Sequence, residues 1–243
     1  MPDILREHFQ LKETIVSIWA HEQKYIETAK LSIRKERSYL EDYIKKDPFF
    51  MFTLEPYDIL DGDDSQTPEI VKQMISCTAV FGVGPMAAVA GVIAKFAVEA
   101  MMLDGATCAI VDNGGDISIL NDSPLLVGIY GGESPIKNLA LEVQPRKTPL
   151  GIATSSGTVG PSISFGYADA ATVVSQDPAL ADAAATALGN AVQENNRLND
   201  CFRAIDRPGI DGALIIRNEE MAVWGDLPPL QRARLSAEKI TRG

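Results

Sequence analysis

Histidine, cysteine and basic residues are all scarce in this chain of 243 residues, and each shortage narrows the functions open to it. The two histidines, His8 and His21, lie in the N-terminal segment with no nucleophile motif beside them. The three cysteines, Cys77, Cys108 and Cys201, are widely spaced among apolar or small residues, which is typical of reduced, buried thiols in a cytosolic protein. We therefore expect structural thiols, with a thiol nucleophile as the alternative.

Positive charge is also in short supply, because 22 Lys and Arg residues face 33 Asp and Glu residues and give a net charge of −11. Binding to nucleic acid needs clustered Lys and Arg, so no nucleic-acid partner is expected. An anionic small molecule would need local help from backbone N–H groups, a helix N-terminus or a metal ion.

Long apolar runs are missing as well. The longest candidate, residues 77–94, is mostly alanine, glycine and valine, carries an internal Gly-Pro and is followed by Lys95. A membrane helix needs about 20 apolar residues, so this stretch indicates a buried turn and helix and no membrane partner. Residues 1–10 carry three charges and no apolar core of a secretory signal, and we expect a cytoplasmic protein.

Hydrophobic periodicity predicts a strand over 13–20 and an amphipathic helix over 22–46. A short aromatic strand is expected in 49–59. Thr67 is the predicted N-cap of the next helix, with Pro68 at its first position.

Further along, the chain alternates small-residue helices with short strands. We expect helices over 86–102 and 179–192, strands over 107–111, 117–120, 125–130, 139–143 and 170–174, a glycine/serine/threonine loop over 151–158, a hairpin of 213–217 with 221–224, and a surface tail over 228–243. This mixture predicts an α+β fold with mixed or antiparallel sheets and packed helices. With no repeat or linker, we expect one domain over 1–243, made of an N-terminal strand and helix (10–60), a core (80–195) and a C-terminal hairpin and tail (205–243).

Two glycine-rich turns are candidate phosphate sites. Gly84 lies in a turn that feeds a helix, whose unpaired N–H groups and positive dipole end favour an anion. Tight helix packing explains the same small residues. Gly114 and Gly115, followed by Asp116, indicate either an anion cradle with a carboxylate at its edge or a simple hairpin turn.

Two hydroxyl-containing segments complete the candidates. Thr154, Ser155 and Ser156 are costly to bury unless they bind something, although they could also cap a helix. Asp182 and Thr186 are four residues apart and share one face of a predicted helix, which makes them a partial ligand set for Mg²⁺. The alternative makes Asp182 a charge near a helix N-terminus, with Thr186 uninvolved.

Taken in order, these segments resemble the ApbE-like superfamily, a T-fold-related group whose best-known members are Mg²⁺-dependent FAD:protein FMN transferases. The matching stretches are Gly91–Lys95, Asp112–Asp116, Ile152–Gly157 and Ala181–Leu188. The segment Val83–Gly91 and the N-terminal layout look closer still to a short, uncharacterised cytosolic branch of that superfamily.

The resemblance implies roles for individual residues. Asp182 and Thr186 would be metal ligands, joined by a main-chain carbonyl within 90–92. The residues that would contact or border an FAD-like nucleotide are Gly84, Lys95, Gly114, Gly115, Asp116, Thr154, Ser155 and Ser156. The reaction implied is FMN transfer with release of AMP, or hydrolysis of FAD.

One family feature is missing. The histidine-containing segment of the family has no counterpart here, since residues 159–164 read Val-Gly-Pro-Ser-Ile-Ser. Loss of an acid or base would disable transfer but could leave binding intact. The alternatives are therefore a non-catalytic binding or scaffold protein of the same fold, or a hydrolase of another phosphorylated molecule that uses Ser155 or Ser156.

Two further expectations depend on weaker patterns. Asp104–Thr107 is similar to the acceptor sequence that such transferases flavinylate, although Gly and Thr are also expected in a turn between helix and strand. The apolar, glycine-rich strands are compatible with a homodimer.

Overall fold

The computed structural model describes residues 4–59, 66–157 and 166–233. An eight-stranded sheet forms its centre, with every neighbouring pair antiparallel and the order β1-β2-β3-β4-β7-β8-β9-β10. A second sheet has the order β11-β6-β5. The strands are β1 (Leu5–Leu11), β2 (Thr14–Ala20), β3 (Ala109–Asn113), β4 (Asp116–Leu120), β5 (Leu125–Ile129), β6 (Leu139–Val143), β7 (Leu150–Ser155), β8 (Ala170–Ser175), β9 (Ile210–Arg217), β10 (Glu220–Gly225) and β11 (Leu230–Arg232).

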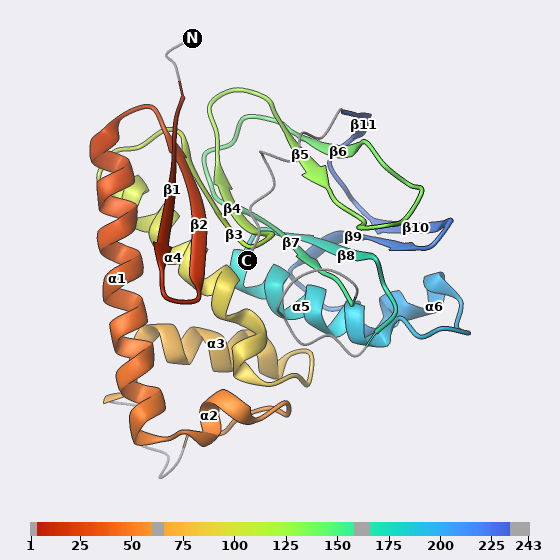
Figure 1. The fold of residues 1–243 in the computed structure, drawn as a ribbon, viewed down its shortest axis with the longest axis horizontal. Coiled ribbons are helices and arrows are strands. Elements are labelled where there is room, and N and C mark those ends of the chain that lie inside the picture. The colour runs from red at the N-terminus through yellow and green to blue at the C-terminus, as the bar shows by residue number, and fades with distance from the viewer. Residues whose placement is uncertain (1–3, 60–65, 158–165, 234–243) are drawn as a thin grey trace.

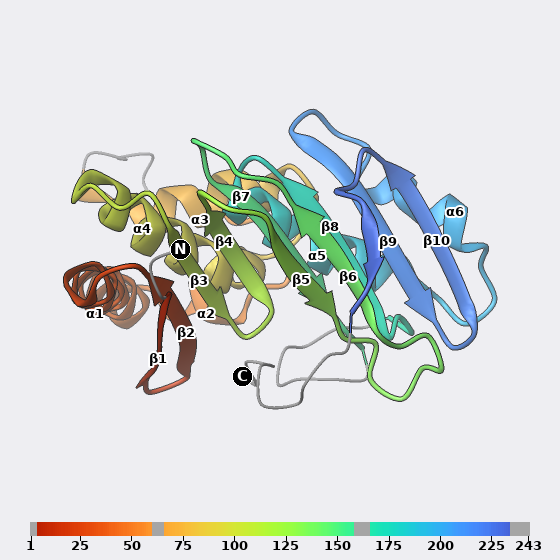
Figure 2. The same ribbon diagram turned by 90° about the horizontal axis from the view of Figure 1, so that it is seen from above.

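Helices cover one face of the large sheet, and the small sheet lies over part of the other (Figures 1 and 2). The helices are α1 (Gln23–Lys46), α2 (Phe49–Phe52), α3 (Glu69–Ala79), α4 (Val89–Leu103), α5 (Pro178–Ala191) and α6 (Leu198–Cys201), with 3₁₀ turns at Pro85–Ala88 and Phe202–Ala204. One apolar cluster, which includes Ile119, Leu141 and Ile216, fills the space between the sheets. Two further clusters lie under the helices.

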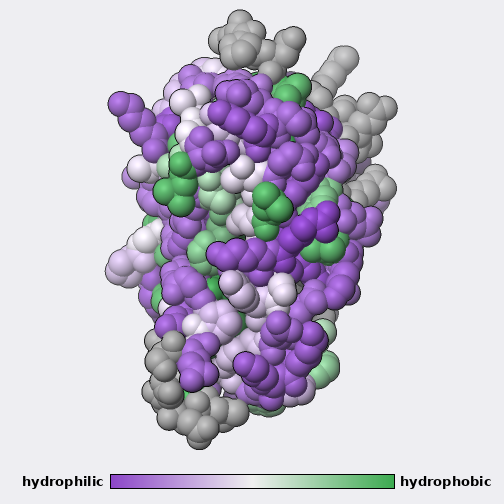
Figure 3. All heavy atoms as spheres, turned by 90° about the vertical axis from the view of Figure 1, so that its left-hand side faces the viewer, coloured by the Kyte–Doolittle hydropathy of each residue, from purple (hydrophilic) through white to green (hydrophobic). Residues whose placement is uncertain are grey.

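The amphipathic helix predicted over 22–46 is present as α1. Ile26, Ala29, Ile33 and Leu40 follow its helical stripe and are buried. The outer face is rich in Lys, Arg and Glu, and Figure 3 shows that this side of the molecule is mostly hydrophilic.

The apolar segment 77–94 divides between the end of α3, a turn and the start of α4. Residues 85–103 form a helical stretch that is long and apolar enough, by length and composition, to cross a membrane. This stretch packs against α1, α5 and the strands β3 and β4, which is the position of a core helix. Its Ala94 and Ala97 are fully buried, so the small side chains permit close packing.

The aromatic strand predicted in 49–59 is wrong, because Phe49–Phe52 forms the short helix α2. Pro48 already has helical dihedral angles, and Oδ1 of Asp47 accepts a 3.0 Å hydrogen bond from the Phe49 N–H. Phe50 is fully buried, with its ring centroid 5.2 Å from that of Tyr43 and 5.0 Å from that of Tyr57. A strand would bury alternate residues, whereas here only the Phe50 ring of this segment is buried, and a helical turn allows this.

The loop predicted over 151–158 is also wrong, because β7 occupies Leu150–Ser155 in the middle of the sheet. A Cβ on Gly151 would lie 2.4 Å from Cα of Pro178, so glycine is needed here for α5 to approach the sheet. The small and hydroxyl residues of this segment are therefore those of a buried strand under a closely packed helix.

Three smaller corrections concern the strand β1, the start of α3 and the C-terminal tail. The strand β1 was not predicted. Thr67 is not the N-cap of α3, because Pro68 holds that position and Glu69 begins the helix. Residues 230–232 of the predicted tail pair with β6 as β11. The predicted hairpin near the C-terminus is confirmed as β9 and β10.

Candidate functional site

The helices α4 and α5 run antiparallel and touch at three polar positions. Lys95 is paired with Asp177 (Nζ–Oδ2 2.9 Å), Gly91 donates its N–H to Oδ2 of Asp182 (2.7 Å), and the Thr186 hydroxyl lies 3.5 Å from the carbonyl oxygen of Ala87. These contacts recur about once per helical turn. Of the predicted metal pair, Asp182 thus faces the first turn of α4 and Thr186 faces the preceding 3₁₀ turn.

The close approach of these helices depends on glycine. A Cβ on Gly91 would lie 2.6 Å from Cβ of Asp182 and 2.6 Å from the Pro178 carbonyl oxygen. The Asp182 carboxylate receives N–H groups from both Ala90 and Gly91 in the first turn of α4. The glycine-rich turn was expected to offer such N–H donors to a ligand anion. In the structure these N–H groups donate to the Asp182 carboxylate of the protein itself.

Asp182 is 7 % exposed and carries a strongly perturbed carboxyl group. Burial raises its pKa to about 7, although the two N–H groups act in the opposite direction. A carboxylate has about four lone-pair positions, so two N–H donors leave room for a cation.

Asp116 is close enough to Asp182 for the Asp182 charge to act on its carboxyl group. The residue is half-buried, and desolvation together with the negative charges of Asp182 and Asp112 raises the pKa of Asp116 well above its ordinary value. The Thr154 backbone donates a hydrogen bond to the Asp116 carboxylate and acts in the opposite direction. The structure therefore brings the predicted residues Asp116, Thr154 and Asp182 to one place, where carboxylates repel each other.

The turn between β3 and β4 is a tight hairpin that holds Asp116 in position. Gly114 and Gly115 have φ values of 70° and 107°, which disfavour other residues, and the Gly115 N–H donates to Oδ1 of Asp112 at 2.9 Å. The side chain of Asn113 donates to the carbonyl oxygen of Ala90 at 3.2 Å. This bond ties the turn to the start of α4, next to Gly91.

Lys95 and Gly84 have structural partners that the sequence did not reveal. The Lys95 ammonium group donates to Gln73 of α3 as well as to Asp177, each at 2.9 Å. A Cβ on Gly84 would lie 2.1 Å from the carbonyl oxygen of Thr53, so glycine is required there by the passing chain.

The hydroxyl residues at the end of β7 are mostly enclosed. Thr154 is half-buried and its hydroxyl is 3.0 Å from that of Thr172 on β8, and Ser155 and Ser156 are buried. Residues 159–164, where the family histidine has no counterpart, lie outside the described residues.

Two residues that the sequence did not connect with the site, Cys77 and Asp177, lie next to it. Cys77 of α3 is buried, and desolvation together with the charges of Asp182 and Asp177 raises the pKa of its thiol to about 12. Asp177 accepts the N–H of Ala179 at 2.9 Å and caps α5, with Pro178 behind it. The Asp-Pro pair was the available signal for that helix start.

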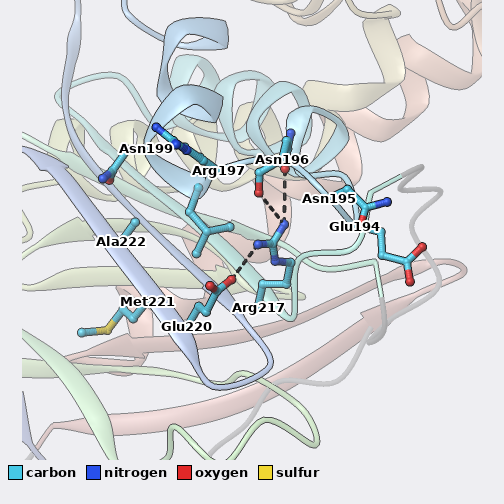
Figure 4. Close-up of a pocket in the computed structure, with 10 residues that line it drawn as sticks. Glu194, Asn195, Asn196, Arg197, Asn199, Arg217, Glu220, Met221 and Ala222 are labelled. Atoms are coloured by element: carbon cyan, nitrogen blue, oxygen red, sulfur yellow. Dashed lines mark hydrogen bonds and ion pairs between the residues drawn. The ribbon is translucent and has the colours of Figure 1, made fainter.

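A surface hollow lies elsewhere in the described part of the chain. It has a volume of about 610 Å³ and is lined by polar residues after α5 and by β10 (Figure 4). Its buried cation, Arg217, is fully engaged by carbonyl oxygens of Gln193 and Asn196 and by Glu220. This hollow contains none of the predicted site residues.

Fold and site together define an α+β protein in which the Gly114–Gly115 turn and the close pair of helices α4 and α5 form an oxygen-rich centre. The chain belongs to the family described as AbpE bacteria, whose model matches residues 1–206. It is 57% identical to a UPF0280 protein of Methanothrix thermoacetophila over 240 residues, which covers 99% of this chain and 100% of that protein.

Solved structures share the fold at low sequence identity. The flavin transferase ApbE from Vibrio cholerae superposes with a TM-score of 0.60 at 13% identity, covering 93% of this chain and 97% of that one. The ApbE protein from Thermotoga maritima gives a TM-score of 0.56 at 12% identity over 99% and 100% of the two chains. The predicted ApbE-like α+β fold is thus confirmed.

Proposed function

We propose that this chain binds a flavin nucleotide of the FAD type through Mg²⁺ at Asp182. The observation that carries the proposal is the presence of two desolvated carboxylates near the first turn of α4, where the charge of Asp182 raises the pKa of Asp116. Such an arrangement is unfavourable by itself, and a divalent cation between the carboxylates and a pyrophosphate would offset the repulsion. The flavin assignment draws on the flavin transferases that share the fold.

The donor set suits Mg²⁺. Carboxylate, hydroxyl and carbonyl oxygens are the ligands this ion takes, and it usually keeps waters and phosphate oxygens as well. Asp182 and Thr186 would hold it, with Asp116 nearby. The carbonyls of Ala87, in the 3₁₀ turn, and of Ala90, in the first turn of α4, lie on the same side. When bound, the cation would neutralise charge on the nucleotide pyrophosphate.

The residues of the chain have separate tasks in this proposal. The N–H groups of Ala90 and Gly91 fix the orientation of the Asp182 carboxylate. The Gly114–Gly115 turn and the Thr154 backbone fix Asp116. Thr154, Ser155 and Ser156 would border the nucleotide. Lys95 holds Asp177 in place, and we assign it the positioning of α5 rather than direct contact with the phosphates.

The test is FAD binding with and without Mg²⁺, measured by calorimetry on the full chain. We expect saturable binding that needs Mg²⁺ and that weakens at least tenfold in Asp182→Asn, which keeps an oxygen acceptor for the Gly91 N–H. Asp42→Asn, which removes an exposed carboxylate on α1, is the matched control and should bind normally. No binding of FAD, FMN or other nucleotides at millimolar concentration would overturn the proposal.

Measurement of turnover distinguishes an enzyme that acts on FAD from a non-catalytic protein that only binds it at this site. AMP release from FAD, followed by chromatography, would identify a transferase or pyrophosphatase, whereas binding without AMP would identify a non-catalytic protein of the same fold. If AMP appears, Asp182→Asn should abolish it; release that is unaffected by this substitution would contradict the metal assignment. A homodimer and a cytoplasmic location stay predictions.

A further inference from the structure

A second cluster of ligating side chains lies at the opposite end of β3 and β4 from the Asp182 site. Cys108 directly precedes β3, Asp122 follows β4 and His21 follows β2. The Gly114–Gly115 turn that leads to Asp116 joins the other ends of β3 and β4. Five residues of strand, or roughly 17 Å, therefore separate the two places.

Strand register explains why these three residues meet. Ala20 pairs with Ala109 and Ala109 pairs with Leu120, so continuing each antiparallel ladder by one residue sets His21 opposite Cys108. Two residues beyond the Ala109–Leu120 pair, Thr107 lies opposite Asp122, and its hydroxyl donates to Oδ2 of Asp122 at 3.0 Å.

The ligand atoms converge. One imidazole nitrogen of His21, the sulfur of Cys108 and one carboxylate oxygen of Asp122 all lie within 4.8 Å of one another. Nε2 of His21 is 2.8 Å from Oδ2 of Asp122, while Nδ1 is buried without a hydrogen-bond partner among the described residues. Bond lengths of about 2.0–2.3 Å to Zn²⁺ put tetrahedral ligand atoms roughly 3.3–3.8 Å apart, so closure of about 1 Å suffices.

We propose that His21, Cys108 and Asp122 form a binding site for a Zn²⁺-class transition metal ion. A thiolate, an imidazole and a carboxylate form a donor set that suits Zn²⁺ and is too soft for Mg²⁺. The Asp122 side chain is 40% exposed and that of His21 is 17% exposed, so the ion has a path from solvent and a fourth position for water. Cys108 is buried and closes the inner side.

Binding of the metal ion releases one proton from the Cys108 thiol. The S–H bond of Cys108 breaks, an Sγ–metal bond forms and the proton passes to solvent. The Thr107 hydroxyl holds the Asp122 carboxylate in place, which is the usual role of groups just behind metal ligands. The ion would join the ends of β2, β3 and β4 close to the start of α1.

The experiment is titration of the chelator-treated full chain with Co²⁺, a spectroscopic substitute for Zn²⁺, followed by competition with Zn²⁺. We expect one ion per chain and a thiolate-to-cobalt charge-transfer band that Zn²⁺ abolishes. Cys108→Ser should remove the band, His21→Gln should weaken binding at least about 100-fold, and Thr107→Val should weaken it about tenfold. Cys201→Ser, which replaces another buried thiol, is the matched control and should keep the band.

Thermal unfolding of each metal-free variant checks that it folds. No charge-transfer band in the wild-type chain, or a band that persists in Cys108→Ser, would overturn the proposal. If Cys108→Ser does not fold, the variants of the two partly exposed ligands, His21→Gln and Asp122→Asn, replace it as the test. Unchanged Co²⁺ affinity in both of them would also overturn the proposal. Asp182→Asn should keep the band, so this result is independent of nucleotide binding.

Discussion

The backbone N–H of Gly91 donates a 2.7 Å hydrogen bond to Oδ2 of Asp182, a residue 91 positions later in the chain. The bond joins the first turn of α4 to the second turn of α5, and it gives Asp182 two roles. The carboxylate satisfies N–H groups at a helix N-terminus, and it is also the leading candidate to hold a cation. Substitutions at Gly91 and Asp182 separate these roles.

Gly91→Ala should destabilise the chain by about 1–3 kcal/mol, because the new methyl group would overlap Cβ of Asp182 and the Pro178 carbonyl oxygen. Urea unfolding measures this change. Gly82→Ala is a suitable control, since its Cβ would have no atom within 4 Å and only its φ of 69° costs energy, about 1 kcal/mol. Equal losses in the two variants would show that α4 and α5 can separate easily.

The pH dependence of stability should report the desolvated carboxyl of Asp182. In the unfolded chain this group ionises near pH 4, and in the folded chain its pKa is about 7. Below pH 4 both states are protonated, and between pH 4 and 7 the unfolded state alone loses its proton. The free energy of unfolding should therefore fall as pH rises through this window and stay lower above it.

Asp182→Asn removes that loss of stability. In chelator at pH 8 we expect the variant to be more stable than wild type by roughly 2–4 kcal/mol, with little difference at pH 4. Urea unfolding at both pH values checks this. A variant less stable than wild type at pH 8 would mean that the attraction between the carboxylate and the α4 N-terminus outweighs the cost of burying the charge.

Mg²⁺ should stabilise the wild-type chain more at pH 8 than at pH 5.5. Protons compete with the cation for Asp182 and Asp116, whose pKa values are both raised. Thermal unfolding over a Mg²⁺ series gives the apparent affinity at each pH. Thr186→Val should weaken the effect, whereas Asp42→Asn should not. An equal shift at both pH values would place the Mg²⁺ elsewhere.

Strongly periodic elements could be predicted from the sequence, and tertiary close contacts could not. The stripe of α1 and the small-residue helices α4 and α5 follow local pattern, and so does the Gly114–Gly115 hairpin. The Gly151 segment resembles a loop in the sequence because its residues are small. In the structure Gly151 must be small because Pro178, which is distant in the sequence, packs against it. Spacing brought Asp182 and Thr186 to one helix face, but no local signal showed that Asp182 would take the N–H groups of α4.

The helix α2 offers a direct test of one such correction. A strand would place Phe50 and Phe52 on the same face, whereas in the structure Phe50 is fully buried and Phe52 is 72 % exposed. Phe50→Ala should cost about 3–5 kcal/mol because it removes a ring packed between Tyr43 and Tyr57. Phe52→Ala should change the free energy of unfolding by less than about 0.5 kcal/mol. Similar losses in both variants would favour the strand.

Lys95 is either a contact to the nucleotide phosphates or one half of a structural ion pair, and substitutions distinguish the two roles. Its ammonium group is held by Asp177 and Gln73, and its side chain is only 15% exposed. Lys95→Gln should therefore reduce stability, and a double-mutant cycle with Asp177→Asn should give a coupling of about 0.5–2 kcal/mol. FAD affinity in Mg²⁺ should fall much less than in Asp182→Asn. A coupling near zero, combined with a large loss of FAD affinity, would return Lys95 to the nucleotide site that the family resemblance implied.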